Sequence, residues 1–342
     1  MVGSRLPCSA SWFSAAFLHY HAVPGFCATD SPDLPIAPST PRLYHPQPMT
    51  RLRADLLLLL AAAVWGFGYL FQKTAMLDVG PFTFVASRAT VAAIVLGFLA
   101  IFEARRAPVP LSRPLVKTAL IAGVAFFVAA SAQQAGMVTA TVTNTGFLTA
   151  LYVVATPLIA WLVFRRWPTP LVWPAVALAF AGVWFLGGGG LAPFGIGDLL
   201  VTLSALGWAT HLLIISGAAG VRPIAFTAMQ FVVVAILAGV AALLTEPVSV
   251  AAIVAAGPDI LFVGVLSSAL TFTILAAALR HTPPSEAAII VSTEVLFAAF
   301  AGMVFLGEQL TPISWFGAAL MFAATLLVQV GPHLGRSKAP AG

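Results

Sequence analysis

The stretch DLLLLLAAAVW, from Asp55 to Trp65, returns further along the chain as DLLVTLSALGW, from Asp198 to Trp208. The match continues downstream of both stretches, in Pro81 and Pro223, Thr169-Pro170 and Thr311-Pro312, and Trp173 and Trp315. Two copies that lie about 142 residues apart therefore follow one another, and each copy holds five hydrophobic spans.

The composition is that of an integral membrane protein. Hydrophobic residues make up 60% of the chain and charged residues 8%, with a mean hydropathy of +1.01; soluble domains have about 25% charged residues. Because lipid offers no hydrogen bonds to the backbone, spans must be helices or a closed barrel. The apolar runs are near the roughly 20 residues that a spanning helix needs. We therefore predict an all-α protein with ten spans, at residues 55–74, 82–102, 116–136, 142–164, 171–187, 197–215, 224–244, 259–279, 285–306 and 313–330.

The placement of basic residues predicts the orientation of these spans. With the segment before the first span in the cytoplasm, the outer flanks hold only Lys73. The cytoplasmic flanks then hold Arg51, Arg53, Arg105, Arg106, Arg113, Lys117, Arg165, Arg166, Arg222, Arg280, Arg336 and Lys338. This asymmetry indicates cytoplasmic termini. It also explains the net charge of +5 without a nucleic-acid partner.

An odd number of spans in each copy has a topological consequence. The second copy must enter the bilayer from the opposite side, as in the inverted repeats of secondary transporters, which enclose a central site. We expect a first five-helix repeat at residues 51–190, a second at 191–332 and a cytoplasmic tail at 333–342.

Residues 1–50 differ in composition from the rest and are expected to be a disordered or mis-called N-terminal extension. Met49 is the predicted initiator; a dispensable or flexible tail is the alternative. The cysteines, Cys8 and Cys27, have no metal-ligand spacing, so neither a zinc site nor a disulfide framework is predicted.

Glu294 is the most informative ionisable residue inside a predicted span. A charge there costs about 2.5–3.5 kcal/mol on insertion scales. With a helical rise of about 1.5 Å per residue from Ser285, Glu294 lies about 13 Å deep, close to mid-bilayer. Either it binds a cation or a proton in a central cavity, or it bonds to a neighbouring hydroxyl and only fixes helix packing.

Arg88 and His211 are the other two ionisable candidates. Arg88 either attracts an anionic group of a substrate or pairs with an acid, or it snorkels or caps a carbonyl. Gln230 is its equivalent in the second copy. His211 either takes part in a proton relay or is a structural residue near a helix end.

A group of aromatic and polar residues could line the same cavity. Trp65, Tyr69 and Gln72 share one helix face, which either contacts an organic substrate or packs on another helix. The further members are Gln133, Gln134, Asn144, Tyr152 and Trp208. Pro157 is expected to kink the fourth span.

These residues resemble a known family over residues 55–330, in order and in both copies. Trp65-Gly66 with Lys73, Pro81 and Arg88 resembles the first-repeat signature of the EamA-type transporters of the drug/metabolite transporter superfamily. The stretches Gly146–Tyr152 with Pro157, and Glu294 with Leu306–Thr311, resemble the fourth helix and the end of the second repeat. The family often has Glu-Pro in the ninth helix, whereas this chain has Glu294-Val295.

The resemblance implies ten helices in two inverted halves around a central cavity, alternating access, and residence in the cell (inner) membrane. It also implies export or exchange of a small organic metabolite or drug, with no cofactor. Proton exchange through Glu294 is one way of coupling. A lipid-carrier flippase is the alternative. An enzyme is not expected, because the spans hold no HExxH, GxSxG or acidic metal cluster. The expected partners are a small-molecule substrate, the lipid bilayer and, as one option, a second copy in a homodimer.

Overall fold

The computed structural model describes residues 49–106, 110–140, 142–163, 165, 167–186, 195–218, 222–306 and 311–336, so the predictions for residues 1–48 lie outside it. The described part is helical and contains no strand, which confirms the predicted all-α class. The first half holds α1 (Arg51–Ala75), α2 (Pro81–Arg106), α3 (Arg113–Gly136), α4 (Val142–Thr149), α5 (Tyr152–Leu162) and α6 (Val172–Leu186). The second half holds α7 (Ile196–Ser216), α8 (Pro223–Thr245), α9 (Val250–Ala255), α10 (Gly257–Leu261), the π-helical η1 (Phe262–Leu270), α11 (Thr271–Ala278), α12 (Pro284–Val291), α13 (Glu294–Leu306) and α14 (Pro312–Arg336).

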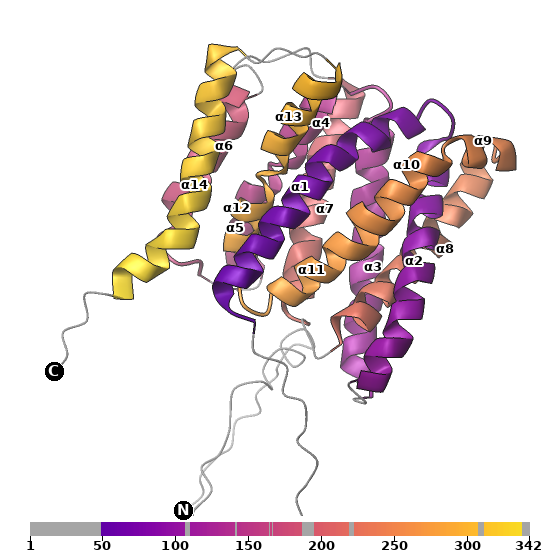
Figure 1. The fold of residues 1–342 in the computed structure, drawn as a ribbon, viewed down its shortest axis with the longest axis horizontal. Coiled ribbons are helices and arrows are strands. Elements are labelled where there is room, and N and C mark those ends of the chain that lie inside the picture. Colours follow the sequence, from indigo (N-terminus) through magenta and orange to yellow (C-terminus); the bar gives the residue numbers. More distant parts are fainter. Residues whose placement is uncertain are drawn as a thin grey trace, which may run out of the picture. The chain divides into compact units, whose positions relative to one another are not determined.

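Eight helical segments in the described residues are long and apolar enough to cross a membrane. The segments Val172–Phe185 and Pro312–Val328 are also apolar but shorter. They correspond to the fifth predicted span of each half, and they belong to α6 and α14, which pack side by side along one edge of the bundle (Figure 1). Eight of the ten predicted spans therefore meet the length expected of a membrane helix, and the full number of ten stays a prediction.

Helices α2 and α8 pack along each other and cap each other's ends. The Glu246 carboxylate, just after α8, accepts hydrogen bonds from the backbone N–H groups of Phe82 (2.7 Å) and Thr83 (2.8 Å) in the first turn of α2. In the same way Glu103, near the end of α2, accepts from the N–H of Ile224 (3.0 Å) in the first turn of α8. A negative charge is favoured at a helix N-terminus. These two repeat-equivalent helices therefore run antiparallel.

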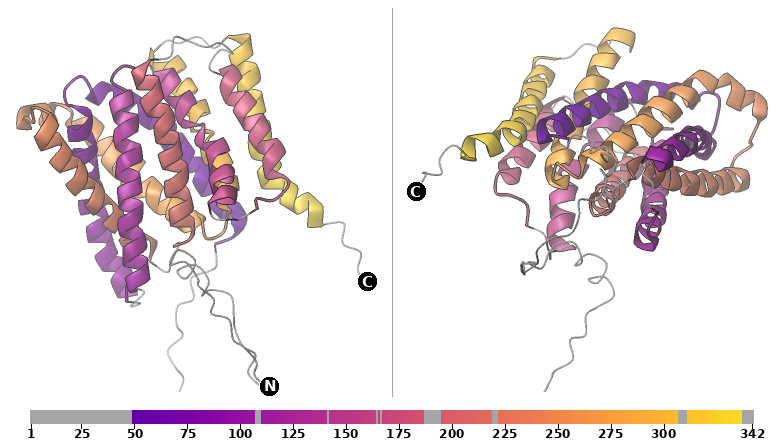
Figure 2. Two further views of the ribbon diagram at one scale, coloured as in Figure 1. Left: turned by 180° about the vertical axis from the view of Figure 1, so that it is seen from behind. Right: turned by 60° about the horizontal axis from the view of Figure 1, so that its bottom comes forward.

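Small residues bring two further pairs of helices close together. Helix α3 packs on α7 (Figure 2, left), where Gly207 lies against Ala129; an ideal Cβ on Gly207 would lie 2.8 Å from the Ala129 Cβ. Helix α1 packs on α13 through Gly66, which lies against the backbone of Glu294. Glycine and alanine allow such close approach of helices within a membrane.

The fourth predicted span is interrupted upstream of Pro157, and a kink at this proline stays a prediction. Helix α4 ends at Thr149 and α5 begins at Tyr152, whereas Pro157 lies inside α5. The N–H of Val153 bonds to the carbonyl of Ala150, three residues back, which marks a tightened turn upstream of the proline. The interruption therefore precedes the proline that was expected to kink this span.

The ninth predicted span is interrupted at the equivalent place. Helix α12 ends at Val291 and α13 begins at Glu294, although no proline follows Glu294. The hydroxyls of the two residues between them, Ser292 and Thr293, donate to the carbonyls of Ile289 (2.8 Å) and Ile290 (2.6 Å). Such side-chain hydrogen bonds compete with the helical backbone pattern.

An ionic cluster joins the start of α1 to the start of α12. Arg51 pairs with Asp55 one turn later (3.7 Å) and with Glu286 of α12. Thr282 donates to Asp55 Oδ1 (2.6 Å), and Thr169 donates to Glu286 Oε1 (3.5 Å). At this end of the bundle the two halves are therefore held together by charged groups.

Candidate functional site

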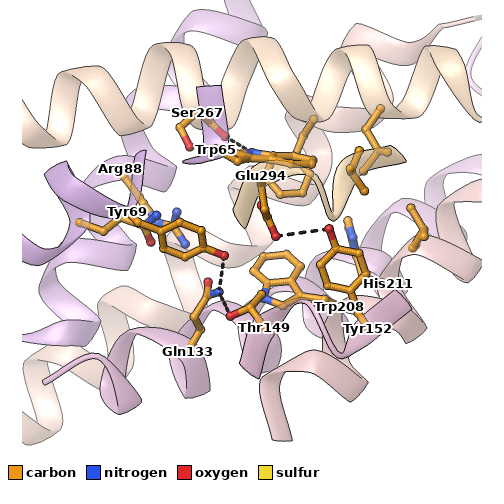
Figure 3. A pocket seen from close by; sticks show the side chains of 15 residues that line it. Trp65, Tyr69, Arg88, Gln133, Thr149, Tyr152, Trp208, His211, Ser267 and Glu294 are labelled. Atoms are coloured by element: carbon orange, nitrogen blue, oxygen red, sulfur yellow. Dashed lines mark hydrogen bonds between the residues drawn. The ribbon is translucent and has the colours of Figure 1, made fainter. Parts of the chain in front are cut away.

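A cavity of about 70 Å³ lies between helices of both halves (Figure 3). This volume is several times the roughly 10–15 Å³ that one ordered water molecule needs on the same measure. Its lining mixes aromatic, polar and aliphatic side chains from Trp65, Tyr69, Gln72, Arg88, Gln133, Thr149, Tyr152, Trp208, His211, Leu212, Ser267, Phe272, Leu275, Val291 and Glu294.

Tyr152 and Glu294 meet in this cavity. The Tyr152 hydroxyl donates to Oε1 of Glu294 at 3.3 Å, and the two residues are 142 positions apart, which is the repeat spacing. Each begins the helix that follows an interruption, α5 for Tyr152 and α13 for Glu294. Glu294 is 4% exposed, and within the described residues no Lys, Arg or His nitrogen pairs with it. Equivalent positions of the two halves therefore contact each other across the cavity.

A chain of polar side chains from the first half continues from this contact. Nε2 of Gln133 donates to the Thr149 hydroxyl (2.8 Å) and to the Tyr69 hydroxyl (3.5 Å). Figure 3 shows the rings of Tyr69 and Tyr152 on either side of the Glu294 carboxyl group. Tyr69, Gln133 and Thr149 come from three helices of the first half, α1, α3 and α4.

Aromatic rings form another part of the lining. The indole Nε1 of Trp65 donates to the carbonyl of Ser267 at 2.8 Å, which fixes the ring against η1. Phe272 lies between the two repeat-equivalent tryptophans, with ring centroids 5.0 Å from Trp65 and 5.9 Å from Trp208. Trp65 thus lines the cavity and also makes a helix–helix contact, and contact of its helix face with a substrate stays a prediction.

Arg88 is buried in the cavity lining. It is 4% exposed, so it does not snorkel to the surface, and its guanidinium carbon lies 5.8 Å from the centre of the Phe84 ring. In the part of the chain that the structure describes, its Nε and Nη2 atoms have no hydrogen-bond partner, and no carboxylate pairs with it. The predicted pairing with an acid or a carbonyl is therefore not seen among these residues.

His211 combines a place in the cavity lining with a structural contact. Its Nε2 lies 2.8 Å from Oε1 of Gln230, so the ring nitrogen is the donor, and its ring packs edge-on against Phe126. Gln230 is buried behind His211 and does not line the cavity. Gln230 is therefore placed to orient His211.

The structure brings most of the predicted site residues together on one cavity. Trp65, Tyr69, Gln72, Arg88, Gln133, Tyr152, Trp208, His211 and Glu294 all line it. Gln230 lies one layer away, and the side chain of Asn144 is outside the described part of the chain. Their role in binding stays a prediction. No group of three or more His, Cys, Asp or Glu residues that could hold a metal ion occurs among the described residues.

Sequence reasoning missed six residues of the lining: Thr149, Leu212, Ser267, Phe272, Leu275 and Val291. The repeat contained a signal for two of them, because Leu212 and Leu275 are the second-half equivalents of the predicted Tyr69 and Gln133. Val291 is the equivalent of Thr149, which was itself not predicted. Aliphatic residues are common throughout every span, so their type alone does not mark them as lining residues.

The chain is similar in sequence to several proteins that are named as transporters or exporters. A transporter of Archaeoglobus fulgidus, named as uncharacterized, is 31% identical over 290 residues, covering 82% of this chain and 87% of that protein. The transporter YwfM of Bacillus subtilis is 28% identical over 82% of this chain and 94% of its own length. The threonine/homoserine exporter RhtA of Escherichia coli K12 is 32% identical over 50% of this chain and 58% of its own length.

The fold and the repeat are matched as well. A crystal structure of another protein superposes with a TM-score of 0.68 at 17% identity and covers 82% of this chain and 98% of that one, which shows a shared fold. The sequence pattern of the EamA-like transporter family matches twice in tandem, at residues 52–188 and 195–330. This chain is a multi-pass membrane protein of the EamA-like transporter family.

Proposed function

We propose that this protein exports or exchanges a small organic metabolite by alternating access. The observation that carries the proposal is the Tyr152–Glu294 contact, which joins equivalent positions of the two halves at two helix interruptions beside one buried cavity. Secondary transporters commonly place the sites for substrate and coupling ion at such discontinuous helices, near the interface of their repeats.

The proposed arrangement has ten spans in two inverted halves, residues 51–190 and 191–332. The protein lies in the cell (inner) membrane, with both termini in the cytoplasm. The antiparallel packing of α2 and α8 supports inversion, since each is the second span of its half. The excess of Lys and Arg on one set of flanks supports the orientation.

Glu294 is the proposed coupling residue. Its carboxyl group is 4% exposed and has the Tyr152 hydroxyl as a neighbour but no cationic side chain paired with it within the described residues. Burial in a low-dielectric site disfavours an ionised carboxylate. A proton, or a cationic group of a substrate, would compensate this charge, so occupancy of the cavity and protonation of Glu294 become linked.

The Arg51 cluster is the proposed cytoplasmic closure. It ties the start of α1 to Glu286 at the start of α12, and thus one half to the other, at the end where both helices begin. Opening the cavity toward the cytoplasm requires these charged contacts to separate. Charged groups regain water when they separate, so such a closure is reversible.

The relatives suggest which solutes to test first. RhtA is named as an exporter of threonine and homoserine, so amino acids are the first candidates for this chain. The flippase alternative gains no support from the relatives, which are named as transporters or as this exporter.

Flux measurements in proteoliposomes test the proposal. Purified protein is reconstituted, and counterflow of labelled threonine, homoserine and wider metabolite pools is measured, followed by flux of the best solute with and without a pH gradient. We expect Glu294→Gln to abolish the component that the pH gradient drives, because the amide cannot exchange a proton. Asp78→Asn is the matched control, since this carboxylate is in an exposed loop outside the cavity and its loss should leave that component unchanged.

Two results would reject parts of this proposal separately. Wild-type vesicles that move no solute in any pool would contradict the transport function. Flux by Glu294→Gln with an unaltered response to the pH gradient would contradict only the coupling role of Glu294.

A further inference from the structure

The two halves contribute different chemistry at equivalent positions of the cavity, although the second half also supplies Glu294, His211 and Ser267. Three pairs of repeat-equivalent residues line it and differ in this way: Tyr69 and Leu212, Gln133 and Leu275, and Thr149 and Val291. In each pair the first-half residue carries a hydrogen-bonding group and the second-half residue is aliphatic. A molecule bound here therefore meets three aliphatic side chains of the second half in addition to the polar groups that both halves supply.

Arg88 adds a positive charge to the first-half part of the cavity lining. It lines the cavity and is 4% exposed, yet its Nε and Nη2 atoms have no partner among the described residues. Burying a cation without a counter-charge is strongly unfavourable. In membrane proteins such a residue marks a place where a ligand or another charge is bound.

The two unpaired nitrogen atoms of Arg88 indicate which chemical group of a ligand would fit beside them. Nε and Nη2 lie on the same edge of the guanidinium, and two parallel N–H donors match the two oxygens of a carboxylate. Two further lining atoms without a partner in the described part of the chain are a donor, Nε1 of Trp208, and an acceptor, Oε1 of Gln72.

We propose that the cavity binds a small monocarboxylate with a short aliphatic body. Its carboxylate pairs with Arg88, and its aliphatic group lies against Leu212, Leu275 and Val291. The proposal rests on the transport function proposed above and names the substrate class of that same site. Both simple carboxylic acids and aliphatic amino acids have this chemistry. The amino group of an amino acid would in addition meet the Glu294 carboxyl group.

Equilibrium binding to the purified full chain in detergent tests the inference with four probes that share one carbon skeleton. These are 4-methylpentanoate, leucine, 4-methylpentanamide and leucinamide, measured by titration calorimetry. We expect at least one of the two acids to bind about tenfold or more tightly than its own amide, as a charge-assisted contact to Arg88 requires. If 4-methylpentanoate shows the preference, a simple acid suffices; if only leucine shows it, the amino group is also needed.

Substitutions then assign this preference to Arg88. In Arg88→Gln, which copies the second-half residue Gln230, the affinity ratio of acid to amide should fall to about one. Arg88→Lys keeps the charge but loses the paired donors, so it should give an intermediate ratio. This variant replaces Arg88→Gln as the test if the glutamine variant does not fold. Arg113→Gln removes an exposed arginine outside the cavity and should leave the ratio unchanged. Leu275→Gln should weaken all binding probes alike and preserve the ratio.

Three results would overturn the inference: equal affinity of wild-type protein for acids and amides, no binding of either acid at millimolar concentration, or an unchanged ratio in Arg88→Gln and Arg88→Lys. None of them bears on whether proteoliposomes carry flux. Failure of the carboxylate assignment is therefore separable from failure of the transport function.

Discussion

A single methyl group at Gly66 should disturb both the packing of α1 on α13 and the site itself. An ideal Cβ on this residue lies 2.5 Å from the carbonyl oxygen of Glu294 and 2.5 Å from the Cβ of Phe297. Ordinary contact begins at 3.4 Å, so Gly66→Ala must push the two helices apart by about 0.9 Å, the difference between these distances. Overpacking of this kind costs about 1–3 kcal/mol. Because the contacted carbonyl is that of Glu294, the shift also moves the carboxyl group relative to Tyr152.

Thermal unfolding in one detergent, together with flux in proteoliposomes, measures both effects. With roughly 2–4 °C for each 1 kcal/mol, as in domains of about 150–250 residues, Gly66→Ala should lower Tm by about 2–12 °C and reduce flux. The matched control is Gly97→Ala in α2, where a Cβ meets nothing within 4 Å. There, better helix propensity should stabilise the protein by about 0.5–1 kcal/mol. A Gly66→Ala protein that melts at or above the wild-type temperature would refute the packing argument.

Two further predictions concern the charged groups that join the halves. Arg51→Gln leaves Asp55 and Glu286 without their shared cation and should lower Tm by several degrees, and adding Glu286→Gln to the same protein should restore part of the loss; no recovery in the double variant would contradict the proposed pairing. Glu103→Ala and Glu246→Ala each remove a carboxylate that caps the partner helix and should each cost about 1 kcal/mol, and because they lie at opposite ends of the α2–α8 pair their effects on Tm should add; strong non-additivity would argue against two independent caps.

The repeat in the sequence was the source of most correct predictions about the fold. Two copies of five apolar runs predicted the helices and their membrane location, because length and composition alone decide whether a helix can span lipid. Length and composition do not decide whether a shorter apolar helix crosses the membrane. Within the described residues, the apolar segments of α6 and α14 are shorter than the usual span, and their mutual packing is a tertiary property that no single run reveals.

The candidate site was found through residues that are costly in lipid. Glu294, Arg88 and His211 stand out because a polar or charged side chain in a span needs a partner, and all three line the cavity. The contact between Glu294 and Tyr152 was not predicted, although their spacing equals that of the repeat. It depends on both spans being interrupted at equivalent positions, which the helical pattern of apolar residues does not reveal.

The interruption before Glu294 illustrates why local sequence was insufficient there. The family pattern placed a proline after this glutamate, and its absence removed the usual reason for a kink. The structure interrupts the helix with the hydroxyls of Ser292 and Thr293 instead, each bonded to a carbonyl three residues back. Serine and threonine are tolerated in ordinary helices as well, so their presence alone does not predict a break. Here the backbone of Gly66 in α1 lies against the carbonyl of Glu294, a tertiary contact at the interruption that the local sequence does not reveal.

The difference in polarity between the halves bears on how a transport cycle could work. If the halves were chemically alike, a bound solute would meet the same groups from either side and would have no preferred orientation. In this chain the polar partners Tyr69, Gln133 and Arg88 belong to the first half, and the aliphatic surface of Leu212 and Leu275 belongs to the second. Hydrogen bonds are directional, whereas contact with hydrocarbon is not. On the proposed mechanism the solute would therefore stay oriented by these first-half groups while the aliphatic residues of the second half move past it. The contacts that join the halves, Tyr152 with Glu294 and Arg51 with Glu286, would have to re-form in each cycle.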